Sequence, residues 1–204
     1  MRRILCACAI ALTVAGCAKP GPQADQASID AVAFRDPGPA YLTLYTMVNN
    51  RSGEGGHTSL MVNASQRVIF DPAGSFYADI VPERNDVHYG ITPAIEKAYR
   101  GAHARSTFHV VRQKIEVTPE QAQIALQLVQ EAGPVPGAYC ANSTSRVLQG
   151  IPGFSGIKTT FFPVNLQNQF EKIPGVVTDK YYEDDSDDLQ KALTEGNTNL
   201  NAPA

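Results

Sequence analysis

The chain has 204 residues, of which 43% are hydrophobic and 18% charged, as expected for one globular domain with little room for a second. Lys and Arg number 17 against 20 for Asp and Glu, giving a formal net charge of −3. This balance excludes the strongly basic surface of a typical nucleic-acid-binding protein, so we expect no nucleic-acid partner.

The first residues have the pattern of an export signal. Arg2 and Arg3 precede a largely apolar run, residues 4–15, which is too short to span a bilayer. The small residues before Cys17 resemble the lipobox of bacterial lipoproteins, in which the cysteine becomes an acylated N-terminus. Residues 1–16 are therefore predicted to be a lipoprotein signal peptide, with Cys17 as the lipidation site. An ordinary secretory signal with an incidental cysteine is the alternative.

Lipidation would make the membrane a partner, because acyl chains such as palmitate hold a protein on a bilayer without a spanning helix. Ala18 is not an acidic retention residue, so resemblance to Gram-negative lipoproteins favours the periplasmic face of the outer membrane. Cys6 and Cys8 would leave with the signal peptide and Cys17 would carry lipid. Cys140 would then be the only free thiol, and no disulfide within one mature chain is expected.

Strand patterns dominate the first half. Residues 17–39 are rich in Pro, Gly, Ala and polar residues and are interpreted as a flexible tether. The β-branched and aromatic segment 40–48 predicts a strand. Residues 57–62 and 67–70 are two apolar runs separated by a short polar turn, which predicts a hairpin.

Helix signals dominate the second half. In the segment 92–100, Thr92 and Pro93 predict a helix start and Gly101 its end. The clearest helix follows Thr118, whose partner Gln121 can close a capping box. This helix is expected to end at Gly133, and the other expected elements are a strand in 106–118, a helix in 139–148 and a last helix in 161–175.

This order predicts an α+β domain over residues 40–175. Residues 176–204 are acidic and polar, and we interpret them as a disordered tail.

Cys140 lies where the helix in 139–148 is expected to begin, because the four small polar residues after Ala141 suit a first helical turn better than a helix interior. Unpaired backbone N–H groups and the positive end of the helix dipole there favour thiolate over thiol. The alternative is that Cys140 is a small buried apolar residue, the usual role of a free cysteine.

A thiolate nucleophile needs an imidazole as base and acid. His57 is the best candidate, since it opens a strand directly after two glycines that permit close approach. His103 is interpreted as solvated in a polar connection, His88 as a loop residue without an obvious partner, and His109 as a core or surface residue of a strand.

Asp71 lies at the far end of the partner strand of the hairpin. With an odd number of turn residues, Asp71 and His57 would be direct or diagonal neighbours on one sheet face, where the carboxylate would orient the imidazole. An even number would place Asp71 on the other face. Asp71 as a simple turn residue before Pro72 is the alternative.

The motifs "GGHTSLMV", "RVIFDPAG" and, much later, "YCANSTSRVL" together resemble the circularly permuted branch of the NlpC-type papain-like cysteine peptidases, to which lecithin retinol acyltransferase is similar. In that branch the histidine strand precedes the cysteine helix. The resemblance covers roughly residues 40–172 and implies a permuted papain-like domain with an antiparallel sheet packed on helices. It implies Cys140 as nucleophile, His57 as base and Asp71 as orienting residue. The small polar residues after Cys140 depart from the family, which often has bulkier apolar residues there.

Such a triad predicts a hydrolase or acyltransferase of the cell envelope that acts on an amide, ester or thioester carbonyl. The backbone N–H of Cys140 would meet the oxyanion, with Tyr45 and Tyr139 as candidates for a second donor. Peptide cross-links of the cell wall are the first substrate guess and lipid-linked acyl groups the second. The competing hypothesis is a non-catalytic envelope module that binds or scaffolds on the same fold.

No cofactor or metal is expected. The chain has no HExxH, no CxxC and no closely spaced pair of histidines. The segment "GEGG" lacks the lysine and the remainder of a phosphate-binding loop.

Overall fold

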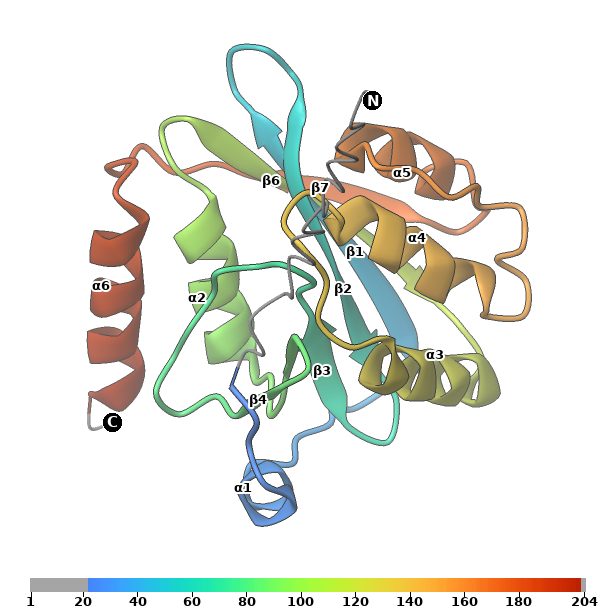
Figure 1. Ribbon diagram of the computed structural model, residues 1–204, viewed down its shortest axis with the longest axis horizontal. Coiled ribbons are helices and arrows are strands. Elements are labelled where there is room, and N and C mark those ends of the chain that lie inside the picture. The colour runs from blue at the N-terminus through green and yellow to red at the C-terminus, as the bar shows by residue number, and fades with distance from the viewer. Residues whose placement is uncertain (1–21, 203–204) are drawn as a thin grey trace, which may run out of the picture.

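A seven-stranded antiparallel sheet forms the centre of the protein in the computed structural model, which describes residues 22–202 (Figure 1). The strand order is β4-β5-β3-β2-β1-β6-β7. The strands are β1 (Tyr41–Asn49), β2 (Gly55–Asn63), β3 (Arg67–Phe70), β4 (Glu83–Arg84), β5 (Val87–His88), β6 (Phe108–Glu116) and β7 (Val177–Tyr181). The predicted α+β class with an antiparallel sheet is confirmed. The predicted signal peptide and Cys17 lie outside the described residues.

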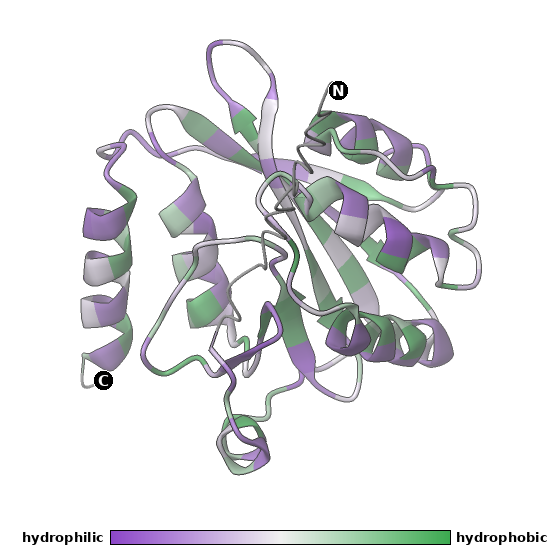
Figure 2. Cartoon of the chain, viewed as in Figure 1, coloured by the Kyte–Doolittle hydropathy of each residue, from purple (hydrophilic) through white to green (hydrophobic). Residues whose placement is uncertain are grey.

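Helices cover both faces of the sheet. They are α1 (Gln26–Ala31), α2 (Pro93–His103), α3 (Pro119–Ala132), α4 (Cys140–Gln149), α5 (Pro163–Phe170) and α6 (Leu189–Asn201). Figure 1 shows α3, α4 and α5 together on one side of the sheet, and α2 with α6 on the other. The central strands are mainly green in the hydropathy colouring of Figure 2, whereas much of the outward-facing helix surface is purple.

The alternation of side chains along the strands divides the core into two clusters. Leu42 and Leu60 belong to the cluster that includes residues of α3, α4 and α5. Tyr45 and Met61 belong to the cluster that includes residues of α2 and α6. Both faces of β1 and β2 are therefore covered, which explains why eight consecutive residues of β1 are buried.

The predicted helix caps are present. The Thr92 side chain accepts a hydrogen bond from the Ile95 N–H at the start of α2, and Thr118 and Gln121 form the capping box of α3. The prediction that Gly101 ends α2 is wrong, because this helix continues to His103. Burial of Ala102 in the core outweighs the cost of about 1 kcal/mol for a glycine in a helix interior.

Both terminal segments contain more structure than their composition predicts. The predicted tether includes α1, whose Ile29 is buried in the core. The predicted tail, residues 176–204, is not simply disordered: β7 pairs with β6 in register, and α6 packs against α2. Asp188 caps α6, and Asp187 accepts hydrogen bonds from Thr107. Acidic residues of this C-terminal segment thus cap a helix and accept hydrogen bonds from the rest of the domain, and these roles cannot be read from composition.

Shortening Leu193 is expected to destabilise the protein. This side chain of α6 is 7% exposed and belongs to the core cluster on the α2 side, so Leu193→Ala should lower the free energy of unfolding by about 2 kcal/mol. Urea unfolding measures the change. The neighbouring exposed Thr194 provides the control, and an equally small effect of both substitutions would mean that α6 is not packed on the domain.

Candidate active site

Cys140 is the first residue of α4, as the sequence predicts, and its side chain is buried. Tyr139 occupies the N-cap position without a side-chain hydrogen bond to the helix, so its side chain does not cap the first N–H groups of α4. Ala138 adopts a φ of 69°, an uncommon conformation for a residue with a Cβ. The chain thus makes a tight, strained turn immediately before the thiol.

The small polar residues that follow the cysteine face the interior. Asn142, Ser143, Thr144 and Ser145 are all buried. The Ser145 hydroxyl donates to the Asn142 carbonyl at 3.0 Å and accepts from the Thr160 N–H at 3.3 Å. Small side chains let α4 approach β2 closely, and α4 packs against that strand. These four small polar residues therefore serve to pack the cysteine helix.

His57 lies near the start of β2, and its side chain is 17% exposed. The two glycines before it do permit close approach, but to other parts of the protein. A Cβ at Gly55 would lie 2.7 Å from Pro163, and one at Gly56 would lie 2.7 Å from the Phe108 ring. These glycines place α5 and Phe108 against the histidine strand.

The hairpin register places His57 and Asp71 on the same sheet face. Asn63 pairs with Arg67, so three residues form the turn and the odd-numbered alternative is the one present. Continuing the register by one residue sets Asp71 opposite Ser59 and diagonal to His57. His57 Nε2 lies 2.7 Å from Asp71 Oδ1.

The other side of the imidazole faces the thiol. His57 and Cys140 are close enough for hydrogen bonding and charge to raise the pKa of one and lower that of the other, and since Nε2 is bonded to Asp71, Nδ1 is the nitrogen available to the sulfur. The backbone N–H groups of Thr58 and Ala141 are also near enough to the sulfur to lower the pKa of the thiol. The fold therefore brings together three side chains that are as many as 83 positions apart in the sequence, in the order Cys140, His57, Asp71.

This arrangement favours a thiolate–imidazolium pair. Burial lowers the pKa of His57, but attraction to the Asp71 carboxylate and its hydrogen bond outweigh that effect and raise the pKa to about 10. Burial raises the pKa of the Cys140 thiol, whereas the hydrogen bond and charge of His57 and the two N–H groups lower it, and the net pKa is below its usual value. Although burial opposes ionisation of Asp71, His57 keeps the pKa of that carboxyl well below its ordinary range.

Sequence reasoning missed three further residues at this site. Tyr99 on α2 donates its hydroxyl to Asp71 Oδ1 at 2.7 Å. His103, predicted to be solvated, stacks on His57 with ring centroids 6.0 Å apart, and burial lowers its pKa to about 4. His88, predicted to lack a partner, is buried in β5 with Nε2 3.8 Å from Asp71 Oδ2. The four-residue spacing of Tyr99 and His103 indicates that both lie on one face of α2. The packing of α2 in the fold is needed to show that this face contacts the hairpin.

Within residues 22–202, His57, Asp71 and His103 form the group whose ligand atoms lie close enough to hold a metal ion. The two imidazole planes are nearly parallel, 13° apart, and stacked. Imidazole lone pairs lie in the ring plane, so stacked parallel rings do not direct them to a common point. His57 Nε2 is also bonded to Asp71. The arrangement fits the hydrogen-bonded triad better than a metal site.

The two predicted tyrosine donors have different positions. Tyr45 is fully buried, and its hydroxyl donates to Glu96 at 2.7 Å, so its only proton is not available to a substrate oxyanion. Tyr139 is 43% exposed and contacts Phe161 edge to face, with centroids 5.1 Å apart. Its position directly before Cys140 leaves Tyr139 as the remaining side-chain candidate. His109, on β6, bonds to Asn50 and stacks on Tyr182, outside the site.

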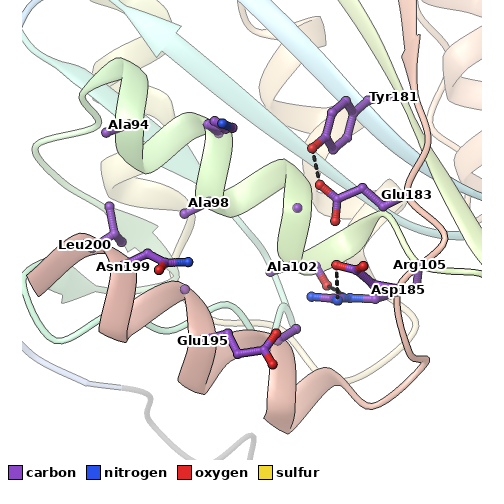
Figure 3. A pocket seen from close by; sticks show the side chains of 14 residues that line it. Ala94, Ala98, Ala102, Arg105, Tyr181, Glu183, Asp185, Glu195, Asn199 and Leu200 are labelled. Carbon is purple, nitrogen blue, oxygen red and sulfur yellow. Dashed lines mark hydrogen bonds and ion pairs between the residues drawn. The ribbon is translucent and has the colours of Figure 1, made fainter. Parts of the chain in front are cut away.

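One open cavity borders the site, and a second lies elsewhere. The first, of about 470 Å³, is lined by residues 73–77, which follow Asp71, and by residues 134–137, which lead to Cys140. The second, of about 410 Å³, lies between α2 and α6. Figure 3 shows Ala94, Ala98 and Ala102 of α2 lining this second cavity. Helical periodicity places Tyr99 and His103 on a different face of α2, so this cavity is separate from the thiol.

Comparison with protein-family models, curated proteins and solved structures finds no match. Among the described residues, no helix has the length and hydrophobicity needed to cross a bilayer.

Proposed function

We propose that this protein is a cysteine hydrolase or acyltransferase that acts on an amide, ester or thioester bond. The observation that carries the proposal is the position of His57, which bonds to Asp71 and lies close enough to the Cys140 thiol to lower its pKa. A nucleophile, a base that activates it and a group that orients the base are the components required for covalent acyl transfer.

In the first half of the reaction, the Cys140 thiolate attacks the carbonyl carbon and forms a C–S bond, while the carbonyl π electrons move to the oxygen. We expect the Cys140 N–H, at the start of α4, to stabilise this oxyanion. When the tetrahedral intermediate collapses, the bond to the leaving group breaks, and the His57 imidazolium donates its proton to the departing nitrogen, oxygen or sulfur.

In the second half, neutral His57 accepts a proton from water, or from the hydroxyl or amine of an acceptor, as that molecule attacks the thioester carbonyl. Collapse of the second intermediate breaks the C–S bond and releases the acyl product. The sulfur leaves as a thiolate and His57 remains protonated, so the starting ion pair is restored. Asp71 stays ionised throughout and stabilises the imidazolium.

We further propose the permuted papain-like, NlpC-type architecture for this domain, because the histidine strand β2 precedes the cysteine helix α4 in the chain. Anchoring through lipid at Cys17 to a cell-envelope membrane, with the outer membrane favoured, completes the proposal. Cell-wall peptides remain the first proposed substrate class and acyl lipids the second.

Thiol reactivity tests the proposal directly. Iodoacetamide should alkylate Cys140 rapidly near neutral pH, and His57→Ala should slow that alkylation at least about tenfold, because the imidazolium that stabilises the thiolate is removed. Mass spectrometry of the peptide that contains Cys140 measures the rate separately from the other cysteines.

His109→Ala is the matched control, since His109 lies outside the site, and it should leave the rate unchanged. Slow alkylation of the wild-type thiol that is insensitive to His57 would contradict the catalytic proposal and favour the non-catalytic binding module. The near-complete burial of Cys140 is the observation that favours that second candidate.

A further inference from the structure

Side chains from three elements of the fold lie around Asp71. Its carboxylate is fully buried. His57 approaches from β2, Tyr99 from α2 and His88 from β5. The carboxylate therefore has one histidine bonded to Oδ1 and a second histidine beside Oδ2.

The two oxygens of the Asp71 carboxylate differ in their hydrogen bonds. Oδ1 is bonded to both His57 and Tyr99, at 2.7 Å each. Oδ2 has no hydrogen-bond partner among the described residues. The His88 Nε2 atom lies 3.8 Å from Oδ2, which is beyond hydrogen-bonding distance. The carboxylate is thus held toward His57 while an unused donor lies beside its other oxygen.

We propose that Tyr99 is a positioning residue that holds the Asp71 carboxylate on His57 and prevents it from turning to His88. This inference rests on the proposed function of the triad. The Tyr99 hydroxyl fixes Oδ1 at the point where His57 also bonds, so rotation toward His88 would break two hydrogen bonds to gain one. Without the Tyr99 hydroxyl, rotation would exchange one hydrogen bond, from His57, for one hydrogen bond from His88.

Tyr99 is itself held firmly. It is fully buried, and its oxygen lies 2.7 Å from the Ser59 hydroxyl. Since Tyr99 uses its only proton for Asp71, Ser59 is the donor in that contact. The Tyr99 ring packs against Phe76 and His103, with centroids 5.0 and 4.5 Å away. Because packing and hydrogen bonds hold the Tyr99 phenol in place, its hydroxyl can keep the Asp71 carboxylate in one orientation.

Two other ionisable groups, His103 and Glu83, lie near the carboxylate or near His88. His103, on α2, is close to both His57 and Asp71, but its Nδ1 is bonded to the Tyr99 carbonyl at 2.8 Å. Glu83, on β4, lies 3.9 Å from His88 Nδ1, so the opposite ring nitrogen, Nε2, is the one that faces Asp71. His88 is therefore the realistic competitor for the carboxylate.

The test is Tyr99→Phe, which removes the hydroxyl and keeps the ring. NMR titration of the imidazoles should show the pKa of His57 falling by at least about one unit from its wild-type value, because Asp71 is now shared with His88. Hydrolysis of a model nitrophenyl ester should lose kcat by about tenfold with KM nearly unchanged.

Two further variants make the test specific. Tyr45→Phe removes another buried hydroxyl bonded to a carboxylate, that of Glu96, and should leave His57 unchanged. Adding His88→Phe to Tyr99→Phe removes the competing donor and should return the pKa of His57 most of the way to the wild-type value. Circular dichroism and urea unfolding confirm that each variant is folded.

An unchanged or raised pKa of His57 in folded Tyr99→Phe would overturn the inference, as would a lowered value that His88→Phe fails to restore. The NMR readout does not require activity. A wild-type protein without an activated thiol would therefore contradict the proposed function, yet the titration would still decide whether Tyr99 directs Asp71.

Discussion

Asp71→Asn is expected to lower ester hydrolysis at least about 100-fold near pH 8, the usual scale for general acid–base catalysis. The pKa of His57 is raised to about 10 mainly by the Asp71 carboxylate, against the opposing effect of burial. A neutral amide removes that attraction, so His57 loses its proton near or below its ordinary value of 6.5. The alkaline limb of the pH–rate profile should move from near pH 10 to below about pH 7.

The same substitution should change the pH dependence of stability. Because the pKa of folded His57 exceeds its unfolded value, its interaction with Asp71 stabilises the protein fully below about pH 6.5, and this contribution is lost as pH rises through about 10. The depressed pKa of Asp71 stabilises the protein above about pH 3.8, and that contribution is lost as pH falls further. Urea unfolding at several pH values measures both effects, and Asp71→Asn should remove them.

Asp36→Asn is the matched control, since Asp36 also accepts a tyrosine hydroxyl, that of Tyr41, at 2.9 Å. It should leave the rate and the alkaline limb unchanged. An alkaline limb that stays near pH 10 in Asp71→Asn would mean that another group sets the charge of His57.

Gly74→Ala is expected to inactivate the site without altering any member of the triad. The added Cβ would overlap the Asp71 carboxylate, and the Gly74 N–H is held by the Asp71 carbonyl at 2.9 Å, so neither residue can move away freely. Asp71 must shift from His57 or the turn must open. We expect a loss of about 1–3 kcal/mol in the free energy of unfolding and at least about tenfold slower alkylation of Cys140.

Gly156→Ala provides the comparison, because a Cβ there would meet nothing within 4 Å. It should leave both stability and alkylation close to wild type. Normal thiol reactivity in a folded Gly74→Ala protein would show that the position of Asp71 tolerates displacement, contrary to the close packing described above.

Features that depend on residues close together in the chain are predictable from the amino-acid sequence. Thr118 and Gln121 identified the start of α3 because capping is a contact between residues three apart. The polar run after Cys140 identified the start of α4, and the hairpin pattern restricted His57 and Asp71 to two possible registers. Each of these signals spans at most about one turn of helix or one hairpin.

The hairpin register and the side chains around the Asp71 carboxylate depend on contacts between distant parts of the chain. A three-residue turn set His57 and Asp71 on one face, and the packing of α2 brought Tyr99 and His103 to them. The acidic C-terminal segment forms β7 and α6 because β6 and α2 offer it partners. Contacts between residues distant in the chain depend on how whole elements pack, and local composition and periodicity carry little information about that packing.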